Sequence, residues 1–227
     1  MHPVAIRREI VERVTARRGR LHLFDTLDPR RCALLVIAMQ NAFVAPGAPV
    51  EVPSARAIVP GINRLAGALR ERGVPVIWVL HENRADGADW EGFYGAFVAP
   101  AHRARAAGAL APGAEMQKLW PHLEARPGDL RMAKNRYSAL IPGASELAGI
   151  LEQRGIDTLL IAGTKTNVCC ECTARDAMML GFKVVLLADC TAALSDAEHL
   201  ATLENVIQQF GDVLSADEAL ALLDRRF

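Results

Sequence analysis

Residues 158–182 read TLLIAGTKTNVCCECTARDAMMLGF, and this stretch decides the fold class. Its first five residues are a short, mostly apolar run, which is typical of a strand buried on both faces. A helix is predicted over residues 167–180, because Gly181 follows and glycine commonly ends helices. A buried strand that leads through a short turn into a helix is the repeating unit of a parallel α/β sheet.

The same alternation continues on both sides of this stretch. Further strands are predicted at residues 33–39, 74–80, 130–134 and 183–188, with a short apolar piece at 212–214, and further helices at 62–72, 145–154, 196–210 and from 216 onward. This order implies a parallel sheet with helices on both faces. Ligands bind such sheets beyond the carboxyl ends of the strands. A site is therefore expected at residues 38–41, 81–94 and 163–172, and at Lys134.

A long irregular stretch, residues 82–127, separates the second and third of these strands. Loops of that length inside a compact domain are usually functional. It holds five of the twelve Phe, Trp and Tyr residues of the chain: Trp90, Phe93, Tyr94, Phe97 and Trp120.

Length and charge limit the class of protein. The chain has 227 residues, with 26 Lys and Arg against 26 Asp and Glu, so its formal net charge is zero. This removes the electrostatic case for a nucleic-acid or membrane-surface protein. One α/β domain is expected over residues 32–227, after an N-terminal helical extension over residues 1–31.

The extension carries Ile6, Ile10 and Val14 at helical spacing among many arginines. This pattern predicts an amphipathic helix that packs on its own domain or on a neighbouring subunit. Binding to an acidic partner is the less favoured interpretation.

Three further features point to the cytoplasm. No apolar run approaches the roughly 20 residues that span a bilayer. The N-terminus has no apolar core of a secretory signal. Finally, the five cysteines are odd in number, and three of them fall within residues 169–172, which does not fit a disulfide framework, so reduced thiols are expected.

The strongest chemical signal is GTKTNVCC, residues 163–170, at the junction of a strand and a helix. Cys169 falls in the first turn of that helix, where free N–H groups favour a thiolate and can hold a developing oxyanion. The alternative is a small buried cysteine without a chemical role. Cys169 and Cys172 also form a C-x-x-C pair, which leaves a redox role open, whereas a zinc site lacks a second ligand pair.

Three segments resemble the isochorismatase-like cysteine hydrolases, a family that includes nicotinamidase, N-carbamoylsarcosine amidohydrolase and ureidoacrylate amidohydrolase. They are VIAMQNAF (36–43), AKNRYSAL (133–140) and GTKTNVCCECTARDAMMLGF (163–182), and they occur in the family's order. The resemblance covers roughly residues 32–214. RYS after the lysine and TNVC before the second cysteine are most similar to the ureidoacrylate amidohydrolase branch.

The resemblance implies a Rossmann-like three-layer sandwich with a six-stranded parallel sheet and an Asp–Lys–Cys triad. Cys169 would be the nucleophile that forms a thioester and releases ammonia, and Lys134 would favour its thiolate. The backbone N–H groups of Lys165 and Cys169 would form the oxyanion hole, with a cis peptide bond between Thr164 and Lys165. The implied protein needs no cofactor and is a homodimer or homotetramer.

One position departs from the family pattern. The family's general base is an aspartate in the pattern D-M-Q-N, and here that position is Ala38. A methyl group neither takes the thiol proton nor returns it to the leaving amine. We weigh two explanations: an aspartate replaced to trap substrate, which the otherwise intact site favours, or a natural member that has lost hydrolysis. An inactive amidohydrolase is expected in both cases.

The pocket is expected to come from the loops. The candidate substrate-binding residues are Asn41, Phe43, His81, Trp90, Tyr94, Arg136 and Tyr137, with Asn83 as a further hydrogen-bond donor; for the aromatic residues the alternative is ordinary core packing. Arg136 would bind a carboxylate, or else pair with a surface acid. The Lys165 side chain would reach an anionic substrate group, or else point to solvent. His22, His102, His122 and His199 are predicted to be structural or surface residues.

No metal is predicted, because the metal-binding Asp-x-His of zinc-dependent nicotinamidases is missing, and nicotinamide is therefore not an expected substrate. The expected substrate is a small ureido, carbamoyl or amide compound. Two alternatives remain: a non-catalytic ligand-binding member of the family, which Ala38 favours, and an isochorismatase-type vinyl-ether hydrolase, which the intact Cys169 site disfavours.

Overall fold

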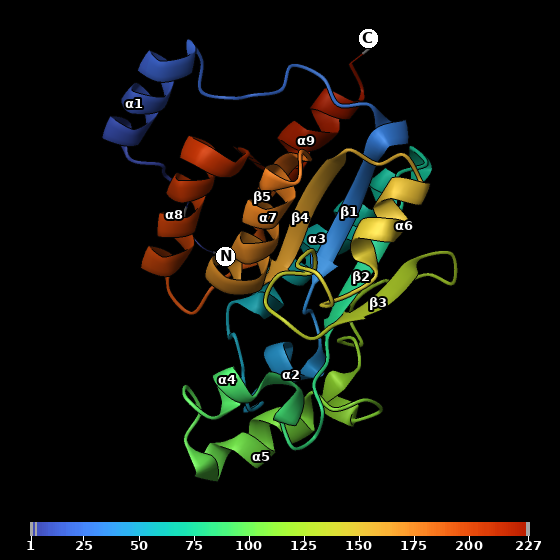
Figure 1. Ribbon diagram of the computed structural model, residues 1–227. Helices are drawn as coiled ribbons and strands as arrows, with labels where there is room; N and C mark the ends of the chain where they lie inside the picture. Colours follow the sequence, from blue (N-terminus) through green and yellow to red (C-terminus); the bar gives the residue numbers. More distant parts are fainter. Residues whose placement is uncertain (1, 3, 226–227) are drawn as a thin grey trace.

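The computed structural model describes residue 2 and residues 4–225, and its centre is a parallel sheet (Figure 1). The strands are β1 (Cys32–Ile37), β2 (Val76–His81), β3 (Leu130–Lys134), β4 (Thr158–Thr164), β5 (Lys183–Ala192) and β6 (Asp212–Leu214). Their spatial order is β3-β2-β1-β4-β5-β6, and every neighbouring pair is parallel. The predicted α/β class and six-stranded parallel sheet are confirmed.

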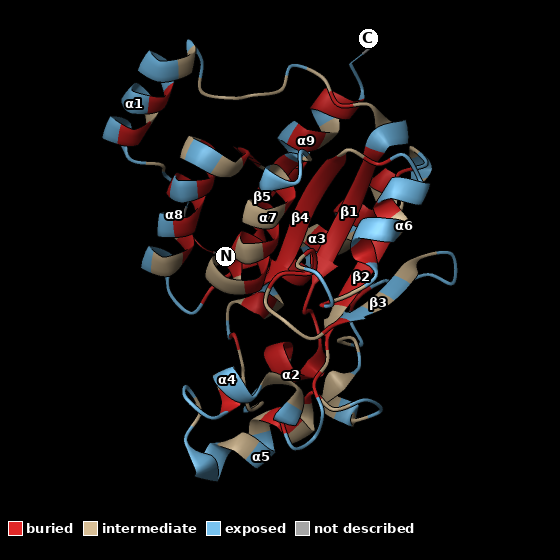
Figure 2. Cartoon of the chain, in the orientation of Figure 1, coloured by how far each residue is buried: buried red, intermediate tan, exposed pale blue. Residues whose placement is uncertain are grey.

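Helices cover both faces of the sheet, with α6 and α7 in front of it and α3 behind it in Figure 1. The helices of the structure are α1 (Arg8–Arg18), α2 (Asn41–Val44), α3 (Ala55–Glu71), α4 (Glu91–Tyr94), α5 (Pro100–Ala109), α6 (Leu147–Gln153), α7 (Glu171–Met179), α8 (Asp196–Asn205) and α9 (Ala216–Leu223). Because both faces are covered, the central strands are buried along their whole length (Figure 2).

Several boundaries differ from the predicted ones. The helix predicted at 62–72 begins at Ala55 and contains Pro60. The helix predicted at 167–180 is a π-turn, η4 (Thr166–Cys170), followed by α7, and the one predicted at 196–210 is α8 followed by a second π-turn, η5 (Val206–Phe210). An apolar pattern gives the helix and its buried face, but it does not distinguish a wider turn from an α-helical one.

The long stretch predicted to be irregular, residues 82–127, contains α4, α5 and two 3-10 turns, η2 (Ala88–Trp90) and η3 (Glu115–Gln117). α4 and α5 lie beyond the carboxyl ends of the strands, at the bottom of Figure 1. Their short length and weak apolar periodicity explain why the sequence did not predict them.

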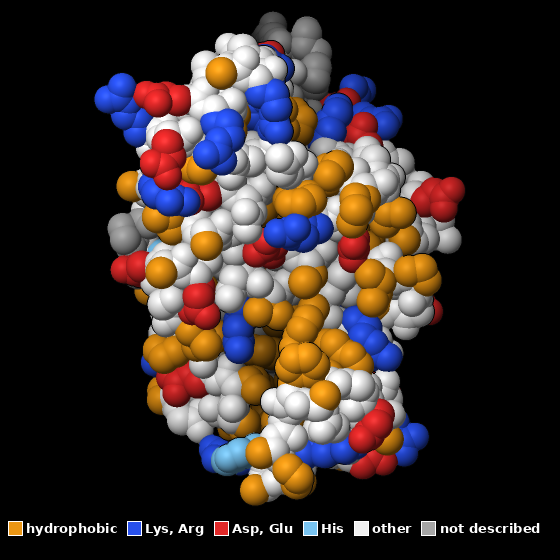
Figure 3. Space-filling view, turned by 60° about the vertical axis from the view of Figure 1, so that its left-hand side comes forward, with side chains coloured by type: hydrophobic (Ala, Val, Ile, Leu, Met, Phe, Trp, Pro, Cys, Tyr) orange, Lys and Arg blue, Asp and Glu red, His pale blue; other side chains and the backbone are white. Residues whose placement is uncertain are grey.

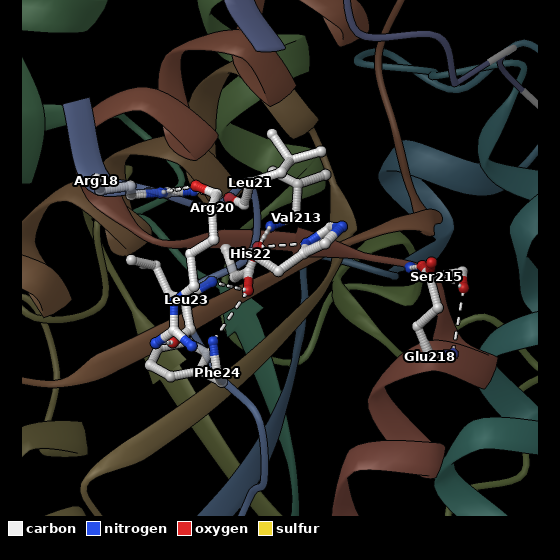
Figure 4. A network of polar contacts seen from close by, with 10 residues as sticks. Arg18, Arg20, Leu21, His22, Leu23, Phe24, Val213, Ser215 and Glu218 are labelled. Atoms are coloured by element: carbon white, nitrogen blue, oxygen red, sulfur yellow. Dashed lines mark hydrogen bonds and ion pairs between the residues drawn. The ribbon is translucent and has the colours of Figure 1, made fainter. Parts of the chain in front are cut away.

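The N-terminal segment packs on its own domain. α1 buries Ile10 and Val14 and contacts η5, and the guanidinium of Arg7 donates to the carboxylate of Glu204. The segment that follows is fixed to β6 by Asp212 (Figure 4). The Asp212 carboxylate is fully buried, and it accepts from the Leu23 N–H at 2.7 Å and lies 2.9 Å from His22 Nδ1. His22 is therefore a structural residue, as predicted.

Within the described residues, no helix combines the length and the apolar character that a membrane crossing requires.

Candidate active site

Polar side chains gather at the carboxyl ends of β2 and β3. His81 is the last residue of β2 and Lys134 is the last residue of β3, and the two are direct neighbours in the parallel register. Both side chains are buried. Cys169 enters the same place from η4, which follows the end of β4.

Lys134 and Cys169, which the family resemblance predicts as two members of a triad, are in contact. The Lys134 Nζ lies 3.3 Å from the Cys169 Sγ. Its two other contacts are the His81 Nδ1 at 3.0 Å and the Arg136 carbonyl oxygen at 2.8 Å. A lysine ammonium has three N–H donors, so each donor has an acceptor. None of these acceptors is a carboxylate.

The turn that carries Cys169 is locked against the end of β1. Gly163 has φ +110°, and a Cβ at this position would lie 2.1 Å from the Ile37 carbonyl oxygen, so only glycine allows β4 to pass so close to β1. The Thr164 hydroxyl donates to the Ala38 carbonyl oxygen at 2.9 Å. The peptide bond between Thr164 and Lys165 is cis, at the predicted position.

Ala38 lies directly after β1 and is fully buried. Its φ is +51°, a left-handed conformation that alanine adopts rarely and that Asp and Asn adopt more readily. Its N–H donates to the Val79 carbonyl oxygen at 2.8 Å. The backbone at this position therefore suits the aspartate that the family pattern has there.

The remaining cysteines near the site are poor nucleophiles. Burial raises the pKa of the Cys170 thiol well above its usual range, and burial together with Cys169 raises the pKa of Cys172 to about 11. Cys169 and Cys172 are both free thiols, and a redox role for this pair stays an untested alternative.

A cavity of about 260 Å³ opens onto Cys169. Its walls are mainly apolar and aromatic: Phe43, Pro49, Val50, His81, Trp90, Phe93, Tyr94, Val98, His102, Ala106, Leu110, Tyr137, Lys165, Val168 and Cys169. The Trp90 ring lies 4.7 Å from the rings of both Phe93 and Tyr137, centroid to centroid. Hydrophobic side chains also gather on the lower half of the face shown in Figure 3. A small flat ligand would fit between such walls, with His81, His102, Lys165 and the two tyrosines as its polar neighbours.

Five of the predicted substrate-binding residues line this cavity: Phe43, His81, Trp90, Tyr94 and Tyr137. The predicted binding roles of Asn41 and Arg136 are not supported, because neither lines the cavity. The Asn41 amide donates to the Glu115 carbonyl oxygen. The Arg136 guanidinium donates to the carbonyl oxygens of Asn135 and Asp89 and lies over the Trp90 ring. These contacts stabilise the loop that carries Asp89 and Trp90.

Several residues that line the cavity were not predicted from the sequence. His102 was predicted to be structural or on the surface, yet it lines the cavity. Phe93 lies in the same aromatic stretch as Trp90, which was the available signal, and Val168 directly precedes Cys169 in the GTKTNVCC motif. Val50 and Leu110 carry no signal, because an isolated aliphatic residue in a loop resembles any other.

Gln40 is a further residue whose role the sequence did not show. Its side chain is fully buried and accepts from the His81 N–H at 2.6 Å, while its amide donates to the His81 carbonyl oxygen at 2.9 Å. This pair of hydrogen bonds holds the backbone at the end of β2.

Electrostatics keep His81 neutral near neutral pH. Burial, with the adjacent Lys134 as the second cause, lowers the pKa of His81 to about 3. Burial also raises the pKa of the cavity residues Tyr94 and Tyr137 to about 12, so both phenols stay protonated and can donate.

Neither a metal site nor another cavity in the described part of the chain gives a second candidate active site. Across residue 2 and residues 4–225, no group of three or more His, Cys, Asp or Glu side chains is placed to hold a metal ion. A larger open groove of about 670 Å³ lies along α3 and His122, but it shares no residue with the cavity at Cys169.

The parallel sheet, with a buried lysine against a cysteine at its carboxyl edge, defines a class of α/β hydrolases that use a cysteine nucleophile. Comparison with known proteins narrows this class. Residues 32–218 match the Isochorismatase domain family, and the chain belongs to that family.

Individual proteins that are similar to this chain support its assignment to the family. The chain is 31% identical over 223 residues to the ureidoacrylate amidohydrolase RutB of Methylobacterium radiotolerans, covering 88% of this chain and 83% of that protein. It is 32% identical over 180 residues to a protein of Arabidopsis thaliana named a probable inactive nicotinamidase, covering 77% and 87%. Among solved structures, a cysteine hydrolase from Pseudomonas syringae pv. phaseolicola superposes with a TM-score of 0.81 at 29% identity, covering 89% of this chain and 96% of the other.

Proposed function

We propose that this chain acts on the C–N bond of a small ureido, carbamoyl or amide compound, with Cys169 as its nucleophile. The observation that carries the proposal is the 3.3 Å contact between the Lys134 Nζ and the Cys169 Sγ, at a cavity large enough for a small planar molecule. The ureidoacrylate amidohydrolase name of two relatives supports the ureido class.

The proposed reaction follows from these groups. The Cys169 thiolate, stabilised by the Lys134 ammonium, attacks the carbonyl carbon, and the charge on the oxygen is held by the N–H groups of Lys165 and Cys169. The C–N bond then breaks, and the nitrogen takes a proton from water and leaves as ammonia, so that an acyl thioester, or a thiocarbamate from a ureido or carbamoyl compound, remains on Cys169. Water attacks this intermediate, its C–S bond breaks, the proton that water loses passes to the departing thiolate, and the carboxylic or carbamic acid product leaves.

Ala38 limits this reaction. Two of the steps move a proton, and the side chain that would move it in the family pattern is reduced to a methyl group. Loss of a general base typically costs about 10²–10⁴-fold in rate. We therefore propose that the chain binds its substrate but hydrolyses it slowly or not at all.

A second candidate function is ligand binding without catalysis, and the observation that favours it is again Ala38. Vinyl-ether hydrolysis of the isochorismatase type is less supported, because the Cys169 and Lys134 contact would then serve no purpose. A cytoplasmic location and a homodimeric or homotetrameric state stay predictions.

The test is ammonia release by the chain and by its Ala38→Asp variant, over ureidoacrylate, N-carbamoyl amino acids, biuret and simple amides. The hydrolase proposal expects release only, or far faster, with Ala38→Asp. Ligand binding without catalysis expects a compound that raises the melting temperature of both proteins, with no ammonia from either.

A further inference from the structure

His81 lines the cavity, but both nitrogens of its ring contact other side chains of the protein. Its Nδ1 lies 3.0 Å from the Lys134 Nζ, and its Nε2 lies 2.7 Å from the Asn83 Oδ1. The Asn83 amide continues the chain to the Asp89 Oδ2, at 3.0 Å. Both His81 and Asn83 are buried.

The donor and acceptor roles in this series of hydrogen bonds are fixed by the groups at its two ends, the Lys134 ammonium and the Asp89 carboxylate. An ammonium only donates, so the His81 Nδ1 accepts and its proton is on Nε2. At the other end a carboxylate only accepts, so the Asn83 Nδ2 points at Asp89 and its Oδ1 points at His81. The Tyr94 hydroxyl donates to the same Oδ1 at 3.2 Å. Each group therefore has a single orientation.

We propose that His81 is a positioning residue, which replaces the missing carboxylate of position 38 in fixing the Lys134 ammonium beside Cys169. The hydrogen bonds from Gln40 to both sides of the His81 backbone keep the imidazole in place. With His81 and the Arg136 carbonyl oxygen each accepting one N–H, the third N–H of Lys134 is directed at the Cys169 Sγ.

The same chain of hydrogen bonds ties the nucleophile to the wall of the cavity. Asp89 precedes Trp90 in η2, and its Oδ1 accepts from the Arg84 N–H at 3.0 Å. The loop that carries Trp90 is thus connected to Lys134 through Asn83 and His81. Its order therefore depends on the same contacts as the order of Lys134.

This inference rests on the proposed role of Cys169 as nucleophile, but its test needs no substrate. The probe is iodoacetamide, which alkylates the thiolate and releases iodide, at pH 7, with adducts on Cys169 identified by peptide mass mapping. Cys169→Ser gives the background from the other cysteines. A failure to find ammonia release would therefore leave this test intact, and a failure here would leave the hydrolysis test intact.

Two substitutions of His81 separate positioning from packing. His81→Leu removes the acceptor, and alkylation of Cys169 is expected to slow by about tenfold, the scale of one hydrogen bond to a charged group. His81→Asn places its Oδ1 where the imidazole Nδ1 was, and it is expected to restore the rate to within about threefold. Alkylation at the original rate in folded His81→Leu would overturn the proposal, as would equal slowing in both variants.

Because a variant of a buried residue can fail to fold, a matched pair on the surface loop is measured as well. Asp89→Ala removes the outer end of the chain of hydrogen bonds and is expected to slow alkylation by about threefold. Asp86→Ala removes an exposed acid of the same loop that has no contact with Asn83, and it is expected to keep the original rate. Equal rates in these two variants would contradict the proposed link.

Discussion

The Lys134 Nζ lies 3.3 Å from the Cys169 Sγ, although the two residues are 35 positions apart and come from opposite sides of β1. Lys134 ends the edge strand β3, whereas Cys169 follows β4 through a turn locked by Gly163. This contact organises the site, because it places the buried Lys134 side chain against Cys169, which lines the cavity.

Removal of the Lys134 charge tests this contact. In the Ala38→Asp background, Lys134→Met is expected to lower ammonia release by about 10²-fold or more, because the thiolate loses its counter-ion. The variant is expected to fold, since methionine fills a similar volume and a buried charge is removed. The control is Lys183→Met, at the exposed start of β5, which is expected to keep the rate. Equal losses in both variants would count against the contact.

The close approach of Gly163 to β1, just before the turn that follows β4, is expected to matter for stability. Gly163→Ala is expected to lower the free energy of unfolding by about 3 kcal/mol or more, because the added Cβ meets the Ile37 carbonyl oxygen in a left-handed backbone. Gly149→Ala, in α6 with open space around the added Cβ, is expected to raise it by up to about 1 kcal/mol. Urea unfolding at pH 7 measures both, and similar values for the two variants would contradict this reading of the turn.

We expect the folded protein to lose stability in acid, because folding lowers the pKa of His81. Its pKa is about 3 in the folded chain, below the usual histidine value of about 6.5, so between these two values the unfolded chain binds a proton that the folded chain does not. The free energy of unfolding therefore falls as pH drops from 6.5 toward 3, by about 1.4 kcal/mol per pH unit for this group.

The measurement is urea unfolding at pH 7 and pH 5, for the chain and for His81→Asn. The chain is expected to lose about 1–2 kcal/mol more than the variant over this range. His199, whose pKa burial lowers to about 4, adds to the loss in both proteins and cancels in the difference. An equal loss in the two proteins would show that His81 does not stay neutral when folded.

The cavity wall makes a prediction about ligand binding. Trp90→Ala removes the ring that packs on Phe93 and Tyr137, and any compound that raises the melting temperature is expected to bind about tenfold or more weakly. Isothermal titration calorimetry measures the change. Trp120→Ala, outside the cavity, is the matched control, and a similar loss in affinity there would mean that the cavity is not the binding site.

The parallel sheet and two residues of the candidate site, Lys134 and Cys169, could be predicted from the sequence. Buried parallel strands are short apolar runs, and the rule that ligands bind at the carboxyl ends of such strands predicts Lys134 and Cys169 as site residues from the sequence alone. The contact of His81 with Lys134 was not predictable in this way. It depends on the register of β2 against β3, which the side chains of either strand alone do not encode.

The loops were predicted least well. Arg136 resembled a carboxylate ligand in the sequence, but in the structure its guanidinium donates to two backbone carbonyl oxygens and does not line the cavity. His102 had no visible partner in the sequence, and yet α5 brings it to the cavity. In both cases the outcome depends on how a loop folds back, which is a tertiary property without periodicity.

Ammonia release is compared between Ala38→Asp and the double variant that carries both Ala38→Asp and Cys169→Ser. We expect the first substitution to create or raise release by about 10²-fold or more for at least one ureido, carbamoyl or amide compound, and the second to abolish it. Release that survives the loss of Cys169 would mean that the nucleophile is another group.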